Sequence, residues 1–303
     1  MKPFPFSLYH PDSKEQDEEP GGSRCENEDA KIRSVNWHIT SRCNYNCRFC
    51  FARDRGDEIH DLEVIRDKFS WLRNSGLEKV TFAGGEPLLH PEIVDFVRIA
   101  KELGFTTSIV TNGRLLDEPI LGRLADYLDW VGISIDSSRE EVERALGRGC
   151  GNHVELVRLA VELVHSFDLK LKINTVVTKL NFEEDMVPLI ETLSPLRWKV
   201  FQCLFVEECN EDCRLDLGTT SEEFSIFEST NRRARLPGGA KSIFERNDDM
   251  INSYLMLSPE GNLTIARGRH YRKIGWDELT RRPLSDFVSI RRYEGRGGNY
   301  DWQ

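Results

Sequence analysis

The sequence predicts an α/β fold in which six strand–helix units form a partial (βα)6 TIM-like barrel. Strand and helix patterns alternate from about residue 34 to 207, and no long polar linker interrupts them. The length of 303 residues suits one large domain or two small ones. Because alternating strands and helices form a parallel sheet covered by helices, and six units are too few for a closed eight-stranded barrel, an open partial barrel is favoured. A doubly wound open sheet is the alternative.

The elements follow one another at regular intervals. Runs rich in β-branched and aromatic residues predict strands over 34–40, 79–87, 106–113, 130–136, 169–178 and 197–207. Apolar residues at helical spacing predict helices over 61–76, 91–104, 119–128, 139–146, 154–167 and 185–193, and Gly76 and Gly104 end two of them. Residues 31–208 are thus the predicted barrel core. Past residue 208 the alternation weakens, so we expect an irregular C-terminal extension over 209–303 that closes the barrel mouth and completes the site.

The charge of the chain is negative and uneven. The formal net charge is −10, and residues 11–30 hold eight acids and two bases, which predicts a disordered acidic tail over 1–30. No apolar run reaches the ~18–20 residues of a membrane span, and the N-terminus lacks the apolar core of a signal peptide. We therefore expect a cytoplasmic protein without a membrane anchor. The acidic balance also argues against direct nucleic-acid binding.

Three of the eight cysteines, Cys43, Cys47 and Cys50, lie in the loop after the first predicted strand. Thiolates at this spacing can converge on one soft metal centre. An iron–sulfur cube usually takes four cysteines, so a cube held by three leaves one iron open to another ligand. The amino and carboxylate groups of S-adenosylmethionine (SAM) can bind that iron, and a reduced cluster can then cleave SAM to a 5′-deoxyadenosyl radical. A structural zinc loop is the alternative. Cys209 and Cys213 have no nearby thiol or histidine to complete a second site.

Further candidate cofactor residues follow the other predicted strands, at the carboxyl edge where function is expected. Two adjacent glycines let the backbone approach a ligand closely, and the glutamate after them can accept a hydrogen bond from an ammonium group. A serine hydroxyl and an arginine guanidinium can hold a carboxylate, and an asparagine in TNG is a ligand contact or a turn residue. These residues are Gly84, Gly85, Glu86, Asn112, Ser134 and Arg148.

The Cys-x3-Cys-x2-Cys motif followed by Gly-Gly-Glu-Pro resembles the radical SAM superfamily. Within it, SVNWHITSRCNYNCRFCF, GLEKVTFAGGEP and SPLRWKVFQC are similar to the viperin family, and the likeness runs from about residue 34 to 257. The resemblance implies a [4Fe-4S] cluster on the three cysteines, SAM with Phe49 at its site, and an electron-donor protein. It also implies conversion of CTP or UTP to the 3′-deoxy-3′,4′-didehydro analogue, an antiviral chain terminator. In that reaction the radical takes the C4′ hydrogen and the 3′-hydroxyl leaves as water.

Basic residues of the last two predicted strands suit such a substrate. Lys170 and Lys172 alternate on one strand, and Arg197 and Lys199 alternate on the next, so each pair shares a face. A triphosphate carries about four negative charges and needs convergent lysines and arginines, although solvated strand edges are the alternative. The resemblance implies that Tyr254 is catalytic. It also implies nucleotide contacts from Asn36, Lys79, Lys172, Asn174, Arg197, Lys199 and Tyr254. We expect Thr81 and Arg267 to contact the nucleotide as well.

The sequence departs from the animal members of the family in two places. Thr81 and Ala83 stand where those carry Asn and Ser, and TIARGRH at 264–270 differs from their NCTGGRK. The two arginines and the histidine in this segment are donors that suit O4 of uracil, so a relaxed preference between CTP and UTP is expected. Two other functions stay open: a radical SAM enzyme acting on a peptide or RNA, and a non-catalytic metal-stabilised binding module.

Overall fold

A ten-stranded sheet is the framework of the protein, in the order β10-β9-β8-β1-β2-β3-β4-β5-β6-β7. The computed structural model describes residues 31–52, 56–207, 209–267, 270–298, 300 and 302, without the side chains of 266 and 267, so the predicted tail over 1–30 lies outside the described residues. All six predicted strands are confirmed, and each runs parallel to the next. They are β1 (Ser34–Thr40), β2 (Lys79–Gly84), β3 (Thr106–Thr111), β4 (Trp130–Ser134), β5 (Lys170–Val177) and β6 (Arg197–Gln202).

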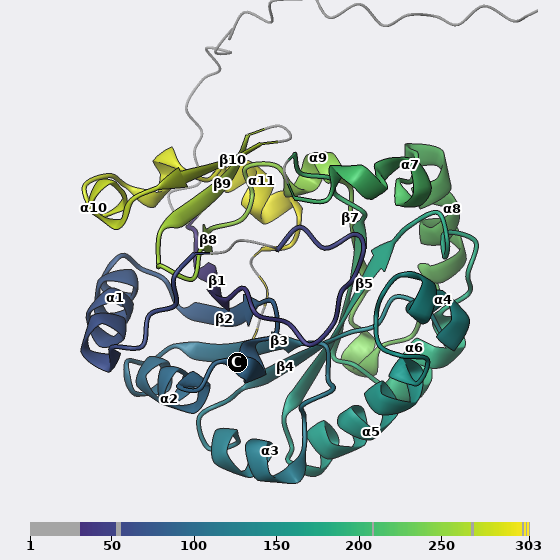
Figure 1. Ribbon diagram of the computed structural model, residues 1–303, viewed down its shortest axis with the longest axis horizontal. Helices are drawn as coiled ribbons and strands as arrows, with labels where there is room; N and C mark the ends of the chain where they lie inside the picture. The colour runs from purple at the N-terminus through teal and green to yellow at the C-terminus, as the bar shows by residue number, and fades with distance from the viewer. Residues whose placement is uncertain are drawn as a thin grey trace, which may run out of the picture. The chain divides into compact units, whose positions relative to one another are not determined.

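The helices between these strands lie along the outer side of the sheet (Figure 1). Asp61 and Asp117 accept hydrogen bonds from backbone N–H groups and so cap α1 and α3. Because β1–β6 are adjacent in chain order, the sheet lacks the switch point that a doubly wound fold requires, and that alternative is wrong. The helical elements are α1 (Leu62–Asn74), η1 (Pro87–Leu89), α2 (Ile93–Glu102), α3 (Glu118–Leu124), α4 (Glu140–Ala145), α5 (His153–Ser166) and α6 (Val187–Leu193).

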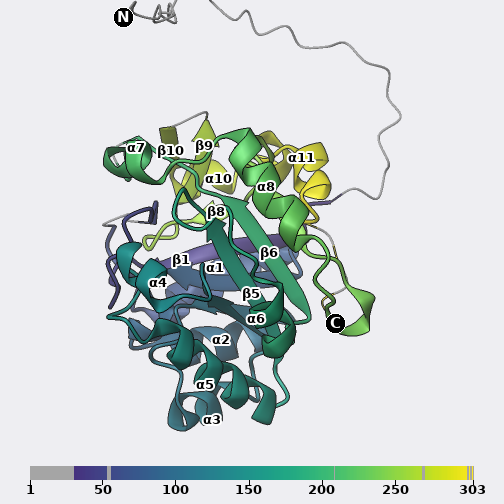
Figure 2. The same ribbon diagram turned by 90° about the vertical axis from the view of Figure 1, so that its right-hand side faces the viewer.

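The C-terminal part is more regular than expected, because it adds strands at both edges of the sheet (Figures 1 and 2). Among these strands, β7 (Ile243–Glu245) runs parallel to β6, and β8 (Met256–Leu257) runs parallel to β1. The hairpin of β9 (Leu263–Arg267) and β10 (His270–Ile274) continues the sheet beyond β8. Strands of two to five residues are too short to show a period of two in the sequence.

Short helices connect and follow these C-terminal strands, and the boundary predicted at residue 208 stays a prediction. They are η2 (Glu211–Cys213), α7 (Arg214–Leu217), α8 (Ser221–Asn231), η3 (Pro237–Gly239), α9 (Asn247–Met250), α10 (Trp276–Leu279), η4 (Leu284–Asp286) and α11 (Ile290–Gly295). Among the described residues, no helix has the length and apolar character to cross a membrane.

Aromatic side chains fill the space between the sheet and its helices. Phe69 of α1 packs edge-on against Trp37 of β1, with ring centroids 5.2 Å apart, and against Phe82 of β2 at 5.9 Å. These residues belong to the main hydrophobic core. A smaller core, which includes Phe49, Leu146 and Cys213, joins the Cys loop to α4 and to the segment after β6.

Candidate active site

Side chains from the inner face of β1–β6 surround a cavity of about 300 Å³. On β5, the alternating burial pattern sends Leu171 and Ile173 into the core and leaves Lys172 and Asn174 facing the cavity. Lys170, on the same strand face, donates instead to the carbonyl oxygen of Trp302 at 3.2 Å. The predicted site residues that line the cavity are Asn36, Phe49, Cys50, Lys79, Thr81, Gly84, Ser134, Arg148, Lys172, Asn174, Arg197, Lys199 and Tyr254.

Strand register brings the polar members of this lining into rows. Asn36 of β1 pairs with Thr81 of β2. At the other side, Lys172 pairs with Arg197 and Asn174 pairs with Lys199. Three of the four side chains of the predicted basic patch, Lys172, Arg197 and Lys199, therefore face the cavity rather than a solvated strand edge, whereas Lys170 does not line it. The side chain of Arg267 lies outside the described residues.

The Cys loop leaves the carboxyl end of β1 and is packed against the turn after β2. A Cβ atom on Gly84 would lie under 3.0 Å from the carbonyl oxygen of Thr40, and one on Gly85 would lie equally close to that of Arg42. Gly84 also has a φ of +149°, which favours glycine. The paired glycines therefore let this turn approach the backbone of the Cys loop.

The three predicted cysteine ligands lie on one loop, and Cys50 lines the cavity. Among the described residues, the one group of three or more ligand side chains whose ligand atoms all lie within 4.8 Å of one another does not include Cys43, Cys47 or Cys50. Thiolates are the usual ligands of iron–sulfur clusters, so the chemistry of this donor set fits a [4Fe-4S] cluster.

The segment after β6 braces the Cys loop from the side. Asn210 Nδ2 donates to the carbonyl oxygen of Phe49 at 2.7 Å, and Cys213 Sγ donates to that of Arg48 at 3.1 Å. Cys213 is buried in the smaller core. This thiol therefore has a packing role next to the ligand loop, and the absence of a second metal site at Cys209 and Cys213 stays a prediction.

Glu86 lies beneath the cavity, where it is fully buried. Its carboxylate accepts from the Thr111 hydroxyl at 2.7 Å and from the backbone N–H groups of Asn112 at 2.8 Å and Leu88 at 3.2 Å. Burial raises the pKa of Glu86 to about 6. Asn112 in turn donates to the side chain of Asn44 in the Cys loop at 2.7 Å. Glu86 therefore positions Asn112, and its predicted contact with an ammonium group stays a prediction.

Arg148 lies at the carboxyl end of the central strands and is buried against acidic partners. Its Nε donates to Asp136 Oδ2 at 2.7 Å, and its guanidinium carbon lies 5.5 Å from the ring centroid of Phe49. Glu143 lies 3.6 Å from the same Nε. Burial, together with the charge of Asp136, raises the pKa of Glu143 to about 8. Asp136 thereby aims the arginine toward the Cys loop side of the cavity, where Ser134 also lies.

Desolvation destabilises the protonated form of the cavity lysines and so lowers their pKa values. It lowers the pKa of Lys79 to about 7, with Arg197 and Lys199 adding repulsion. It lowers the pKa of Lys199 to about 8 and that of Lys172 well below the ordinary range. A bound polyanion would reverse these shifts, because it supplies the negative charge that the site lacks.

One buried carboxylate stands among these cations. Glu245, at the end of β7, forms an ion pair with Lys199 and accepts from the Tyr254 hydroxyl at 2.5 Å. Lys199 donates to the same hydroxyl at 3.0 Å, and the guanidinium of Arg296 lies 3.6 Å from the Tyr254 ring centroid. Burial and the nearby Glu245 charge raise the pKa of Tyr254 well above its ordinary value. Tyr254 is therefore a protonated phenol held by a lysine and a carboxylate.

Tyr300 covers the basic patch from the C-terminal side. Its hydroxyl accepts from Lys79 Nζ at 2.5 Å, and its ring centroid lies 3.5 Å from the guanidinium of Arg197. Trp130 and Trp302 also flank Lys79, with ring centroids 5.0 and 5.4 Å from Nζ. Aromatic faces thus compensate part of the burial of this cation.

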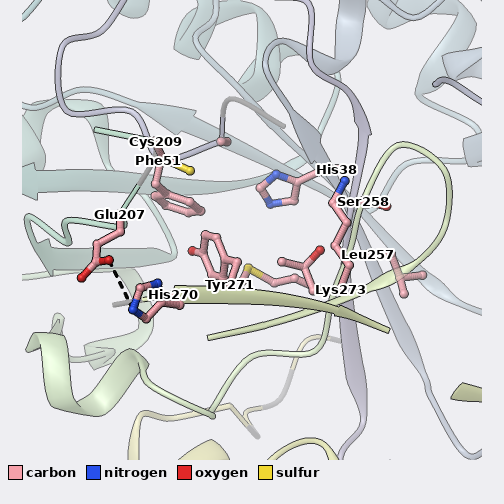
Figure 3. A pocket seen from close by; sticks show the side chains of 12 residues that line it. His38, Phe51, Glu207, Cys209, Leu257, Ser258, His270, Tyr271 and Lys273 are labelled. Carbon is pink, nitrogen blue, oxygen red and sulfur yellow. Dashed lines mark ion pairs between the residues drawn. The ribbon is translucent and has the colours of Figure 1, made fainter. Parts of the chain in front are cut away.

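Figure 3 shows the residues that line a second cavity, of about 380 Å³. This cavity adjoins the first, because the two share lining residues. Phe51 and Tyr271 line both cavities, and β9 and β10 contribute to the wall of the second. His270 faces it and lies 3.2 Å from Glu207 (Figure 3). Thr264 and His270, at the two ends of the segment that the sequence linked to base preference, therefore border a space next to the main cavity.

Sequence reasoning missed Glu245, Arg296 and Tyr300 as site residues. Glu245 lies on a three-residue strand and has no motif around it. Arg296 and Tyr300 fall in GRGGNYDW, beyond residue 257, where the stretch that is similar to the family ends. Each of these residues reaches the site through contacts between segments that are distant in the chain, which a local pattern does not reveal.

Comparison with known proteins places the chain among proteins of related sequence and fold. Residues 37–193 match the family model of the radical SAM superfamily. A protein named S-adenosylmethionine-dependent nucleotide dehydratase, from Thermoplasmatales archaeon (strain ISO4-H5), is 35% identical in sequence. The alignment covers 90% of this chain and 97% of the archaeal protein. The Danio rerio protein named S-adenosylmethionine-dependent nucleotide dehydratase RSAD2 is 37% identical in sequence. Its alignment covers 89% of this chain and 78% of the Danio rerio protein. The solved structure of native anSMEcpe with bound AdoMet and Kp18Cys peptide has the same fold, with a TM-score of 0.64 and 17% sequence identity. The alignment covers 86% of this chain and 82% of the anSMEcpe chain.

Proposed function

The chain belongs to the radical SAM superfamily, and we propose that it dehydrates a pyrimidine ribonucleoside triphosphate, CTP or UTP, to the 3′-deoxy-3′,4′-didehydro analogue. The observation that carries this proposal is a single cavity with a three-cysteine loop at one side and a buried basic patch at the other. The names of the related proteins support the reaction class. The basic patch supports a triphosphate as the substrate, and an antiviral chain terminator is the corresponding product.

The residues present fit a [4Fe-4S] cluster and SAM. Cys43, Cys47 and Cys50 would hold the cluster, and Ser134 and Arg148 would hold the methionine end of SAM next to Phe49. Gly84, Gly85, Glu86 and Asn112 would support this end of the cavity from below. When bound, the two cofactors supply a 5′-deoxyadenosyl radical that takes the hydrogen atom from C4′ of the nucleotide.

The basic patch binds and orients the triphosphate. Lys79, Lys172 and Arg197 come from three strands, so their charges converge on one part of the cavity. Asn36, Thr81 and Asn174 lie on the same inner face, next to where the sugar would lie. The burial of these cations lets them bind phosphate oxygens strongly, because little water competes there.

Tyr254 supplies the proton that the reaction needs at the sugar. The 3′-hydroxyl leaves as water, so its oxygen must gain a proton, and an electron from the donor protein completes the C3′–C4′ double bond. The Tyr254 phenol is shared between Lys199 and Glu245. A proton lost from the phenol oxygen can thus be replaced from the Lys199 ammonium group, and Arg296 stabilises the ring from its face.

Other parts of the sequence interpretation remain inferences. We infer that β1–β6 curve as a partial barrel, which the placement of helices on one side of the sheet supports (Figure 1). The position of Glu245 and Tyr254 in the site supports a role for residues 209–303 in completing it. An electron-donor protein, a cytoplasmic location and the lack of direct nucleic-acid binding stay predictions from the sequence.

A nucleotide panel tests the proposed function. The cluster-loaded chain is incubated anaerobically with SAM, a reductant and each ribonucleoside triphosphate. CTP and UTP should lose one water, detected by mass, with one 5′-deoxyadenosine formed for each product. The Cys50→Ala chain is the control and should form neither. Cleavage of SAM without loss of any triphosphate would point to the peptide or RNA alternative, and no cleavage at all would point to a binding module.

Competition between equal amounts of CTP and UTP tests base preference. C4 carries an amino donor in cytosine and a carbonyl acceptor in uracil, and an unpaired buried polar group costs roughly 1–3 kcal/mol. His270 borders the adjoining cavity and is paired with Glu207, so this wall offers both a donor and an acceptor. We expect both products in comparable amounts, and an exclusive choice of CTP would contradict the interpretation of 264–270.

A further inference from the structure

Two histidines and two glutamates meet at a place that lines neither cavity. Glu58 and His60 lie between the Cys loop and α1, and His90 and Glu92 lie between η1 and α2. One ligand atom each from Glu58, His60 and His90 lies within 4.8 Å of the other two. Segments separated by about thirty residues therefore bring together nitrogen and oxygen donors that the proposed reaction does not use.

The imidazole of His90 is buried, and one of its two ring nitrogens lacks a hydrogen bond among the described residues. The side chain is 0% exposed, and its Nε2 has no hydrogen-bond partner among the residues that the structure describes. Burial lowers the pKa of His90, so the imidazole is neutral near pH 7. An unpaired buried polar atom costs about 1–3 kcal/mol, and a ligand at Nε2 would remove this cost.

Glu58 offers an oxygen toward both histidines. Its Oε2 lies 3.9 Å from Nε2 of His90 and 3.9 Å from Nε2 of His60. Arg42 donates to the same oxygen at 2.8 Å, while Oε1 accepts from Arg42 Nε and from the Thr40 hydroxyl. Because a carboxylate oxygen has two acceptor sites, Oε2 keeps one that Arg42 does not use.

Glu92 contacts the opposite sides of both rings. Its Oε2 lies 2.9 Å from Nδ1 of His60 and 3.3 Å from Nδ1 of His90. Its backbone N–H also lies 3.3 Å from Nδ1 of His90, so without a ligand the His90 proton sits on Nε2. Moving this proton to Nδ1, toward the Glu92 carboxylate, frees the Nε2 lone pair. A carboxylate behind each imidazole is how metal-binding histidines are oriented.

We propose that Glu58, His60 and His90 bind a zinc ion, with Glu92 orienting both histidines. Two imidazoles and a carboxylate are a donor set that suits zinc and not magnesium. Zinc–ligand bonds of about 2.0–2.2 Å place tetrahedral ligand atoms about 3.3–3.5 Å apart. The side chain of His60 is 55% exposed, so its rotation closes the gap to Oε2 of Glu58, and a small movement of the Glu58 carboxylate closes the gap to Nε2 of His90. The ion would tie the segment after the Cys loop to the start of α2.

Metal counting on the cluster-loaded chain tests the proposal. The protein is washed with a chelator, dialysed anaerobically against limiting Zn²⁺, and analysed for zinc and iron. The wild type should hold one more zinc than His60→Gln at equal iron content. His165→Gln is the matched control, because His165 is an exposed residue of α5, and it should hold as much zinc as the wild type. Glu92→Gln should bind about ten- to a hundredfold more weakly.

Thermal unfolding gives an independent readout. Zn²⁺ should raise the Tm of the wild type and of His165→Gln, and it should leave that of His60→Gln unchanged. Mg²⁺ should raise none of them. Equal zinc content and an equal Tm shift in His60→Gln would overturn the proposal, as would a loss of zinc in His165→Gln. Neither measurement depends on turnover, so the result stands apart from the proposed reaction.

Discussion

Raising the pH should weaken triphosphate binding, because the cavity lysines lose their protons in the free protein at ordinary pH. Desolvation lowers the pKa of Lys79 to about 7 and that of Lys199 to about 8. The bound triphosphate favours the protonated amines, so binding at a pH above these values must include proton uptake. The sign is therefore fixed: the dissociation constant rises with pH.

The size of the effect follows from the two pKa values. If both amines are protonated in the complex, the dissociation constant should rise about tenfold from pH 7 to 8 and about fiftyfold from pH 8 to 9. Lys172, whose pKa lies lower still, would add to this rise if the nucleotide protonates it. An unshifted lysine, with a pKa near 10.4, would contribute almost nothing over the same range.

Calorimetric titration with CTP checks this, on the cluster-loaded chain under anaerobic conditions. Repeating it in buffers with different ionisation enthalpies counts the protons taken up. The Lys79→Met chain is the matched comparison: it should bind more weakly at pH 7 and take up fewer protons. An affinity that stays constant between pH 7 and 9, or binding without proton uptake at pH 8, would refute the reasoning.

Three substitutions test other parts of the site. Cys47→Ala should remove the cluster iron and all 5′-deoxyadenosine formation, whereas Cys209→Ala should keep both, as iron and sulfide analysis will show. Gly85→Ala should lower Tm and cluster loading, because its Cβ would overlap a carbonyl oxygen of the Cys loop; Gly122→Ala, with nothing within 4 Å, should not. Tyr254→Phe should lower kcat about ten- to a hundredfold, as expected for a charge-assisted hydrogen bond of roughly 1.5–3 kcal/mol, with the affinity for SAM unchanged; an unaltered kcat would exclude the phenol as proton source.

The fold is predictable from the sequence wherever elements are long and periodic. On β5, Leu171 and Ile173 alternate with Lys170, Lys172 and Asn174, and that pattern alone is enough to place Lys172 and Asn174 on one face of the strand. The pattern is informative because the outer face is covered by helices and must be apolar. The two-residue strand β8 gives no such signal, since two residues are too few to show a period and its partner β1 lies far away in the chain.

The candidate site is predictable where chemistry forces residues to be close in the chain, as in the Cys loop. It is not predictable at Glu245, where a carboxylate faces the opposite charges of Lys199 and Arg296 across long sequence distances. A basic patch without this group would hold still more unpaired charge in the free protein, at the cost of stability. Glu245 reduces that repulsion and at the same time keeps the Tyr254 proton in place. Glu245 leaves no local motif, because Lys199, Tyr254 and Arg296 come together around it only in the folded chain.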